Sequence, residues 1–278
     1  TLNLTSNILI AGQILKSPKT LSKNELDPFT VGLIDGDGSL QVNQWRRKNL
    51  QFRLIIKLAD KPLNFEMLTQ IAKTYGGLIQ KITTKNGKFV QWVVNDKKTF
   101  NKTIIPLLDK YPPLTSRMTL QYLFFKKYLL NYESAGSTVM EQYFIERKLK
   151  YVNRDKITPL FAVTPCYFKE WLAGFIEAEG SFSIRVKGNY SFSIGQNHDF
   201  YLIEAIRNYY GLHHLKILNK KAKLNNIPFY EFSVGSASGT EKVIDHCTKL
   251  LQGYKYYQLA VFILNSKIFK DRLKEFFN

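Results

Sequence analysis

The feature that most constrains this chain is a short motif that occurs twice, about half a chain apart. The first copy is FTVGLIDGDGS from Phe29 to Ser39, and the second is WLAGFIEAEGS from Trp171 to Ser181. Each copy is an apolar, helix-like run with small residues four positions apart, followed by an acid and then Gly-Ser. Small residues at positions i and i+4 share one helix face, and they let a second helix come very close. We therefore predict that the two motif helices pack against each other.

The last acid of each motif copy predicts a metal-binding site. Asp37 and Glu179 stand in the last turn of their helices, where the helix end already carries about half a negative charge. If the helices pack together, two carboxylates and two negative helix ends meet at one place. Such a place is stable when a cation neutralises it, and a divalent metal ion is the simplest one. The small residues at the predicted helix interface are Gly32, Gly36, Gly174 and Ala178.

The net charge indicates the class of partner. The chain has 278 residues, a formal net charge of +18 and an isoelectric point near 9.7. A protein this basic favours a polyanion, with DNA or RNA ahead of an acidic membrane. The sequence has no uncharged apolar run long enough to span a membrane. Its only cysteines are Cys166 and Cys247, which excludes a disulfide framework and a thiolate metal site, and we expect both to be buried.

The repeat extends beyond the motif, which indicates a tandem duplication. Each half reads as a helix, two strands, a helix, two strands and then further helices. The predicted fold class is α+β, with two repeats related by a pseudo-twofold axis and a four-stranded antiparallel sheet in each. In the first half we expect strands at 40–45, 51–58, 78–84 and 88–94, and helices at 63–75, 97–109 and 115–130. In the second half we expect strands at 182–186, 190–196, 215–221 and 227–234, and helices at 200–210, 239–251 and 255–273.

This organisation divides the chain into four segments. Residues 1–24 form an N-terminal extension of unassigned role, and residues 25–132 form the first repeat. Residues 133–165 connect the halves through a helix at 139–150 and a Pro-interrupted linker, and residues 166–278 form the second repeat. A globule of this size is roughly 50 Å across and would cover on the order of 15–20 base pairs of a duplex.

Basic residues follow the predicted strands of both halves. An antiparallel sheet needs helices on only one face, so the other face of each sheet is free to contact a partner. Two basic sheet faces related by a pseudo-twofold axis suit a DNA duplex, because β-ribbons fit the major groove. The predicted DNA-binding residues are Arg46, Arg47, Arg53, Lys57, Lys81, Lys85, Arg185, Lys187, Lys216, Lys220, Lys221 and Lys223.

The paired motifs and their matching flanks resemble the LAGLIDADG homing endonucleases, in the single-chain form with two repeats. The resemblance covers roughly residues 26–275. It implies a DNA-binding saddle of two sheets joined through the motif helices, and a staggered cut in both strands of a long target. It also implies that Asp37 and Glu179 bind the catalytic metal ions, with the backbone carbonyls of Gly36 and Ala178 as additional ligands. Oxygen ligands suit Mg²⁺. We expect Mn²⁺ to replace it and Ca²⁺ to support binding without cleavage.

The resemblance implies further catalytic residues. The family places a basic residue in each half near the start of a late helix, and the matching residues are Arg117 and Lys255. A polar residue late in the second strand of each half positions water, and Gln196 matches it in the second half. The aligned position of the first half is Ile56, an apolar residue. We therefore predict two unequal active sites and unequal rates of strand cleavage.

Other functions are compatible with the same scaffold. One is an intron RNA maturase that helps its host intron splice, and another is a DNA-binding regulator without catalysis. The presence of both acids favours a nuclease that initiates homing of its intron. The expected partner is double-stranded DNA, with the host intron RNA as a second possible partner. We expect no membrane binding, and we expect the protein to be a monomer. The family's organellar members and the richness in Asn, Lys, Ile, Tyr and Phe point to a mitochondrial protein.

Overall fold

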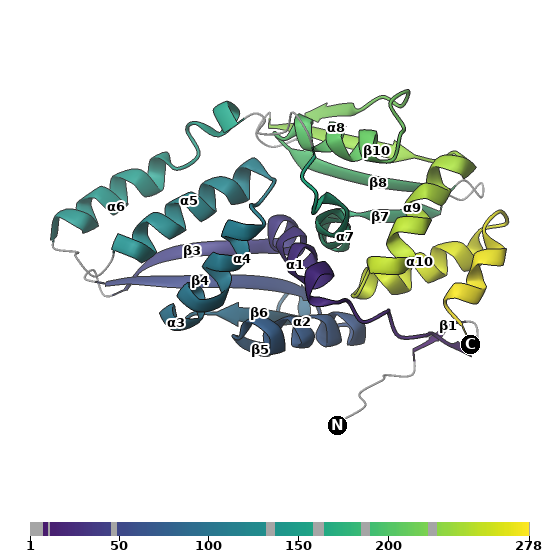
Figure 1. Cartoon of the computed structure of the whole chain (residues 1–278), viewed down its shortest axis with the longest axis horizontal. Helices are drawn as coiled ribbons and strands as arrows, with labels where there is room; N and C mark the ends of the chain where they lie inside the picture. Colours follow the sequence, from purple (N-terminus) through teal and green to yellow (C-terminus); the bar gives the residue numbers. More distant parts are fainter. Residues whose placement is uncertain are drawn as a thin grey trace.

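The computed structural model describes residues 8–10, 12–45, 49–131, 137–157, 164–184, 190–221 and 227–277. Two antiparallel sheets of four strands each lie on either side of a central pair of helices (Figure 1). Helices pack against one face of each sheet, so the architecture is the predicted α+β fold with two similar halves. No helix within these ranges is long and apolar enough to cross a membrane.

The central helices are α1 (Lys23–Asp37) and α7 (Phe168–Glu179), which carry the two motif copies. They cross so closely that a Cβ atom added to Gly32 would lie 1.9 Å from the carbonyl oxygen of Trp171. The reciprocal contact is equally close, because a Cβ atom added to Gly174 would lie 1.9 Å from the carbonyl oxygen of Phe29. Each glycine therefore lies directly against the backbone of the opposite helix, and the two motif helices join the halves as the motif predicts.

The first sheet has the strand order β3-β4-β6-β5, and all neighbouring strands are antiparallel. Its strands are β3 (Gly38–Trp45), β4 (Asn49–Ala59), β5 (Leu78–Thr84) and β6 (Gly87–Val94). Alternate residues of β4, such as Phe52, Leu54 and Ile56, are buried under the helices. The residues between them face the other side of the sheet, which we call the open face. Because β3 follows α1 directly, the motif helix ends at the inner edge of this sheet.

The second sheet repeats this arrangement in the order β7-β8-β10-β9. Its strands are β7 (Ser181–Ile184), β8 (Tyr190–Asn197), β9 (Leu218–Lys221) and β10 (Pro228–Val234). Phe192, Ile194 and Phe232 point into the core. The strand predicted at 215–221 begins three residues later, because residues 213–215 form a turn.

The helices agree with the sequence prediction in order and differ from it at some ends. In the first half and the connection they are α2 (Pro62–Tyr75), α3 (Lys97–Thr99), a π-helical turn (Phe100–Ile104), α4 (Ile105–Lys110), α5 (Ser116–Asn131), α6 (Ser137–Leu149) and a 3₁₀ turn (Arg154–Ile157). In the second half they are α8 (Phe200–Tyr209), α9 (Ala237–Leu250), α10 (Tyr254–Asn265) and a 3₁₀ helix (Lys270–Glu275).

The helix predicted at 255–273 is wrong at its C-terminal end. Helix α10 ends at Asn265 because Ser266 adopts an extended backbone conformation. The Ser266 hydroxyl oxygen then accepts hydrogen bonds from the backbone nitrogens of Ile268 and Phe269, each at 3.2 Å. A serine side chain that binds the following backbone in this way competes with the helix and ends it.

The N-terminal extension packs against the end of the chain. Strands β1 (Leu9–Ile10) and β2 (Gln13–Ile14) form a short hairpin. Leu15 then pairs with Phe277, and the backbone nitrogen of Lys16 donates to the carbonyl oxygen of Phe276 at 2.8 Å. The extension thereby ties the segment before α1 to the second half of the molecule.

The two cysteines lie in different environments. Cys247 is buried in α9, as predicted, and its burial raises the pKa of its thiol. Cys166 is exposed, so the prediction that both cysteines are buried is wrong for this residue. It lies two residues before α7, outside the closely packed part of the motif helix.

Candidate active site at the ends of the motif helices

The C-terminal ends of α1 and α7 bring Asp37 and Glu179 together. The Cγ atom of Glu179 lies 3.3 Å from the position that a Cβ atom on Gly36 would occupy. Enclosure by the protein, with the Asp37 carboxylate as a second cause, raises the pKa of Glu179 to about 7. Enclosure also raises the pKa of Asp37 to about 6, although the charges of Lys255 and Arg117 act in the opposite direction. The two acids therefore share one site in which full ionisation is unfavourable without an added cation.

Arg117 binds the end of the first motif helix. It is the second residue of α5, and its guanidinium donates to the carbonyl oxygens of Asp35 at 2.6 Å and Gly36 at 3.0 Å. A further bond reaches the carbonyl oxygen of Gly38 at 3.0 Å. These carbonyls belong to the negative end of the helix dipole, which a guanidinium stabilises. Arg117 is thus a fixed positive charge beside Asp37.

Lys255 occupies the corresponding place in the second half. It is the second residue of α10, and its backbone nitrogen donates to Glu177 Oε1 at 2.9 Å. Burial lowers the pKa of its ammonium group, while the carboxylates of Glu177, Asp37 and Glu179 act in the opposite direction. The structure therefore brings both predicted cations to the acid pair, with an arginine on one side and a lysine on the other.

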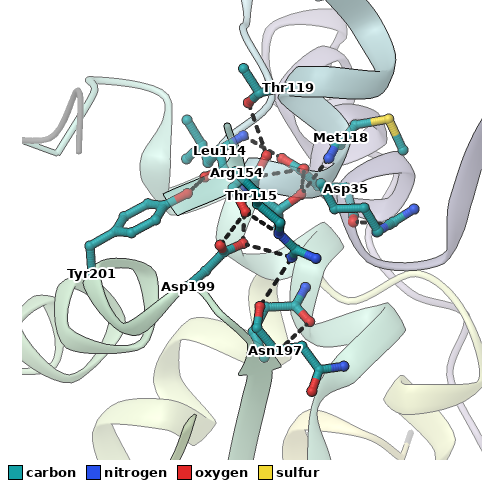
Figure 2. Close-up of polar contacts among 12 residues, drawn as sticks. Asp35, Leu114, Thr115, Met118, Thr119, Arg154, Asn197, Asp199 and Tyr201 are labelled. Carbon is teal, nitrogen blue, oxygen red and sulfur yellow. Dashed lines mark hydrogen bonds and ion pairs between the residues drawn. The ribbon is translucent and has the colours of Figure 1, made fainter. Parts of the chain in front are cut away.

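The earlier acid of the first motif, Asp35, holds the loop that leads into α5 (Figure 2). Its carboxylate accepts hydrogen bonds from the backbone nitrogens of Leu114 at 2.6 Å and Thr115 at 3.1 Å. It also accepts a bond from Trp171 Nε1 at 2.9 Å, which links it to the other motif helix. Burial raises the pKa of Asp35 to about 6 even though these donors lower it. Asp35 is therefore a buried anchor for the segment that carries Arg117.

Glu177 has the same role in the second half. Its carboxylate accepts bonds from the backbone nitrogens of Gln252 at 3.4 Å, Gly253 at 3.1 Å and Lys255 at 2.9 Å. Burial raises its pKa, and these backbone donors lower it. A Cβ atom on Gly253 would lie 2.5 Å from Glu177 Oε1, so only glycine allows this close approach. Each motif thus uses one acid to fix the loop that carries a cation and a second acid at the shared site.

The strand register corrects the alignment proposed for Gln196. Gly38 pairs with Ile56 in the first sheet, and the pairing of β7 with β8 places Gly180 level with Ile194. Ile56 therefore corresponds to Ile194, and the alignment of Ile56 with Gln196 is wrong by two positions. Residues two apart in a strand share one face, so the hydrophobic pattern alone does not reveal such a slip.

The side chain of Gln196 is buried on the helix-covered side of β8. Its Oε1 atom accepts a hydrogen bond from the backbone nitrogen of Asn197 at 3.0 Å. The register pairs it with Tyr230, two residues beyond the level of the motif end. A role for Gln196 in positioning water stays a prediction, and its observed contact does not support it.

Two of the predicted DNA-binding residues lie on the open face of β4. Arg53 pairs with Gln41 and lines a cavity of about 390 Å³ together with Asn43 and Lys97. The ammonium group of Lys57 lies 4.2 Å from the centre of the Phe89 ring, on the same face. Both positions are available to a partner that lies along the sheet.

Lys81 and Lys220 are less available than predicted. Lys81 pairs with the buried Val90, on the helix-covered side, and its ammonium group lies 3.2 Å from Asp60. The prediction of Lys81 on the free sheet face is therefore wrong, because the register turns it toward α2. Lys220 does lie on the open face, where it donates to Glu231 Oε1 at 2.7 Å.

The remaining predicted basic residues lie at strand ends or beyond the described ranges. Lys85 is exposed in the turn between β5 and β6, and Lys216 is exposed just before β9. Lys221 ends β9, and its side chain is not among those described. Arg46, Arg47, Arg185, Lys187 and Lys223 fall outside the described residues.

Uncharged polar residues on the open faces were missed by the search for basic residues. In the first sheet, Asn43 donates to Gln41 and Gln41 donates to Ser39, each at 3.2 Å. Gln91 donates to Gln80 at 2.7 Å on the same face. In the second sheet, the paired open-face positions of β7 and β8 carry Ser181, Ser183, Ser191 and Ser193. Amide and hydroxyl groups of this kind read base edges in DNA. Because successive side chains of a strand point to opposite faces, the positions between the buried residues would have identified these polar side chains.

The donor set fits a divalent metal ion that also takes ligands from its surroundings. Asp37 and Glu179 supply carboxylate oxygens, and the Gly36 carbonyl keeps one lone pair after it binds Arg117. Within the described ranges, no cluster of three or more His, Cys, Asp or Glu side chains could hold a metal. Asp37, Glu179 and the Gly36 carbonyl would hold a bound Mg²⁺, and water and substrate phosphate would supply its other ligands, as is common for this ion.

Comparisons with known proteins agree with this geometry. The family model described as LAGLIDADG endonuclease matches residues 30–129 and again residues 172–264. Each match contains the end of one motif copy and the helix that carries its cation. The two matches therefore correspond to the two halves seen in the structure.

Similar proteins include two named "Probable intron-encoded endonuclease aI3". The one from Debaryomyces hansenii is 36% identical over 87% of this chain, which spans only 38% of that longer protein. The one from Dictyostelium citrinum is 38% identical over 70% of this chain and 78% of its own length. Among solved structures, the meganuclease I-CpaMI bound to uncleaved DNA has the same fold. Its TM-score is 0.70 at 20% identity, with 90% of this chain and 93% of that chain covered. This chain therefore belongs to the LAGLIDADG endonuclease family.

Proposed function

We propose that this protein is a site-specific DNA endonuclease that hydrolyses one phosphodiester bond in each strand and leaves staggered ends. The main support for this proposal is the pair of acids, Asp37 and Glu179, between the two sheets. The cations Arg117 and Lys255 lie beside this pair. The two nearest phosphates on opposite strands lie across the minor groove, so a shared acid pair suits one cut in each strand. Such a cut would initiate homing of the intron that encodes the protein.

The residues of the site have distinct proposed roles. Asp37 and Glu179 would hold a divalent ion, Mg²⁺ or Mn²⁺, which activates water and stabilises charge on the phosphate and the leaving oxygen. Arg117 binds carbonyl oxygens at the end of α1, and its positive charge would stabilise the phosphate. Lys255, whose pKa is lowered by burial, is the better candidate for a proton donor or acceptor, since an arginine does not give up its proton.

The open faces of the two sheets are the proposed DNA-binding surfaces. Arg53 and Lys57 would contact phosphates, while the amide and serine side chains beside them would contact bases. Because one chain supplies both sheets, we expect a monomer on a duplex of on the order of 15–20 base pairs. A mitochondrial location is proposed by analogy with the family and agrees with the intron-encoded names of its relatives.

The test of this function is a cleavage screen on a large randomised duplex library. The protein is incubated with Mg²⁺, and the ends are sequenced beside an EDTA sample and a Glu179→Gln sample. Recurrent ends that need both Mg²⁺ and Glu179 would establish the activity, the target and the stagger together. A folded protein that binds nucleic acid but enriches no ends would instead favour the maturase or regulator function.

Metal binding is expected to become stronger as the pH rises from about 5 to about 8. The ion binds the ionised acids, and protons compete with it while the pH is below the pKa values of about 6 and about 7. We therefore expect the melting-temperature increase caused by Mg²⁺ to be small at pH 5.5 and to level off near pH 8. Thermal unfolding with and without Mg²⁺ measures this. An increase that is the same at both pH values would contradict the proposed ligands.

A further inference from the structure

The segment before each cation is held from the opposite half of the molecule, and the two halves do this differently. In the first half, Ser116 starts α5 and is followed directly by Arg117. The backbone nitrogen of Ser116 donates to Asp199 Oδ2 at 3.0 Å, and its hydroxyl group donates to the other carboxylate oxygen. Asp199 immediately precedes α8, so this contact crosses from the first half to the second.

A residue of the connection between the halves, Arg154, also takes part in the contact between Ser116 and Asp199 (Figure 2). Arg154, in the 3₁₀ turn after α6, donates from Nε to the Ser116 hydroxyl oxygen at 2.7 Å. Its terminal nitrogen donates to the carbonyl oxygen of Asn197 at 3.1 Å and lies 3.8 Å from Asp199. The three segments therefore meet at Ser116, whose hydroxyl group both donates and accepts.

The charges in this cluster are nearly enclosed. The side chains of Arg154 and Asp199 are only 17% and 2% exposed. Burial raises the pKa of Asp199, while Ser116 and Arg154 act in the opposite direction. Removing one partner of such a pair leaves the other charge buried without compensation, and the remaining groups then rearrange. A change at Arg154 should therefore move Ser116 and the start of α5.

The second half makes the corresponding contact with a neutral side chain. The backbone nitrogen of Tyr254, the residue before Lys255, donates to Asn64 Oδ1 at 2.8 Å. The Asn64 amide nitrogen in turn donates to the carbonyl oxygen of Ala59 at 3.0 Å. Asn64 therefore makes the same kind of contact as Asp199, from within the first turn of α2, and it offers a matched test residue on the Lys255 side.

We propose that Arg154 is a positioning residue for Arg117, so that the connection between the halves controls one of the two strand cuts. This inference rests on the proposed endonuclease function. Arg154 and Asp199 fix Ser116, and the next residue then reaches the carbonyls of Asp35, Gly36 and Gly38. Misplacement of a catalytic group by about 1 Å lowers rates by up to about a hundredfold. The effect should fall on the strand served by Arg117.

The test measures the cutting rate of each strand separately, on the target recovered from the library screen, with different dyes on the two strands. Arg117→Met defines which strand depends on Arg117. We expect Arg154→Met to change the ratio of the two strand rates by about tenfold in the same direction. Ser116→Ala, which removes only one hydroxyl group, should change the ratio in that direction as well. Asn64→Ala should change it in the opposite direction.

Arg272→Met is the matched control for lost stability. Arg272 is also mostly enclosed, at 19% exposed, and its ion pairs join Asp245 of α9 and Glu275, not Ser116 or Asp199. We expect this variant to lower the melting temperature and leave the strand ratio unchanged. If Arg154→Met folds but slows both strands equally, or if Ser116→Ala keeps the wild-type ratio, the proposal is overturned. A wild-type protein that cuts neither strand would instead reject the endonuclease function itself.

Discussion

Replacing Glu179 by Gln is expected to reduce DNA cleavage by about a thousandfold while target affinity stays within about threefold. The substitution keeps the shape of the side chain and removes one of the two carboxylates that would hold the metal ion. The proposed DNA contacts of Arg53 and Lys57 lie on the open face of β4, in a different element from the motif helix that ends at Glu179. Single-turnover cleavage with Mg²⁺ and equilibrium binding with Ca²⁺ measure the two properties. Affinity that falls as far as the cleavage rate would mean that Glu179 is structural.

The same substitution should stabilise the metal-free protein at pH 8. The pKa of Glu179 is about 7 in the folded protein and near 4.5 in the unfolded chain, so the folded state holds this proton more tightly. Ionisation of Glu179 therefore lowers the free energy of unfolding, and this loss grows as the pH rises from about 4 to about 7. Allowing for the solvent that reaches the site, Glu179→Gln should recover about 1–2 kcal/mol at pH 8 and little at pH 4. Urea unfolding in EDTA at both pH values tests this.

Replacing Gly174 by Leu is expected to abolish cooperative folding. The first carbon of the new side chain would lie 1.9 Å from the carbonyl oxygen of Phe29 and 2.9 Å from the backbone nitrogen of Leu33. Both atoms belong to the backbone of α1, so neither moves without separating the motif helices. Overpacking by small groups already costs about 1–3 kcal/mol, and this larger overlap approaches the total stability of a typical domain. Circular dichroism on heating and size-exclusion chromatography measure the result.

Gly12→Ala is the control for this prediction. A Cβ atom on Gly12 meets no atom of the described residues within 4 Å, and its positive φ of 84° adds backbone strain. That strain is worth about 1–2 kcal/mol, so the variant should fold with a slightly lower melting temperature. Gly174→Ala, which meets the same Phe29 carbonyl, should lose much more stability than Gly12→Ala. Equal losses, or a wild-type melting temperature for Gly174→Leu, would refute the close helix packing.

The two halves are similar in fold and unequal in chemistry. In the first half, the residue before Arg117 is Ser116, which binds the charged side chains of Asp199 and Arg154. In the second half, the residue before Lys255 binds the neutral side chain of Asn64. The bound Arg117 acts as a fixed charge, whereas Lys255 has a lowered pKa. We therefore still predict unequal strand rates, now from the different cations and their supporting contacts, and this prediction does not require the alignment of Gln196 with Ile56.

Much of the fold was predictable because its signals are local. The spacing of Gly32 from Gly36 and of Gly174 from Ala178 specifies the helix faces that pack, and strand alternation specifies the helix-covered face of β4. Element order followed from periodicity and from turn residues. Two predictions failed because they depended on a single residue or on the strand register. Ser266 ends α10 earlier than predicted, and the register of β5 places Lys81 on the helix-covered side.

The sequence by itself determined the repeat, the pairing of the motif helices and the acids Asp37 and Glu179 at their ends. The tertiary structure alone decided how the site is supported. Asp35 reaches Thr115, Glu177 reaches Gly253, and Arg154 reaches Ser116 across loops whose paths no local pattern specifies. Periodicity records which face of an element is apolar. It does not record which distant polar group will satisfy a buried donor, because that depends on loop length, strand register and the packing of both halves.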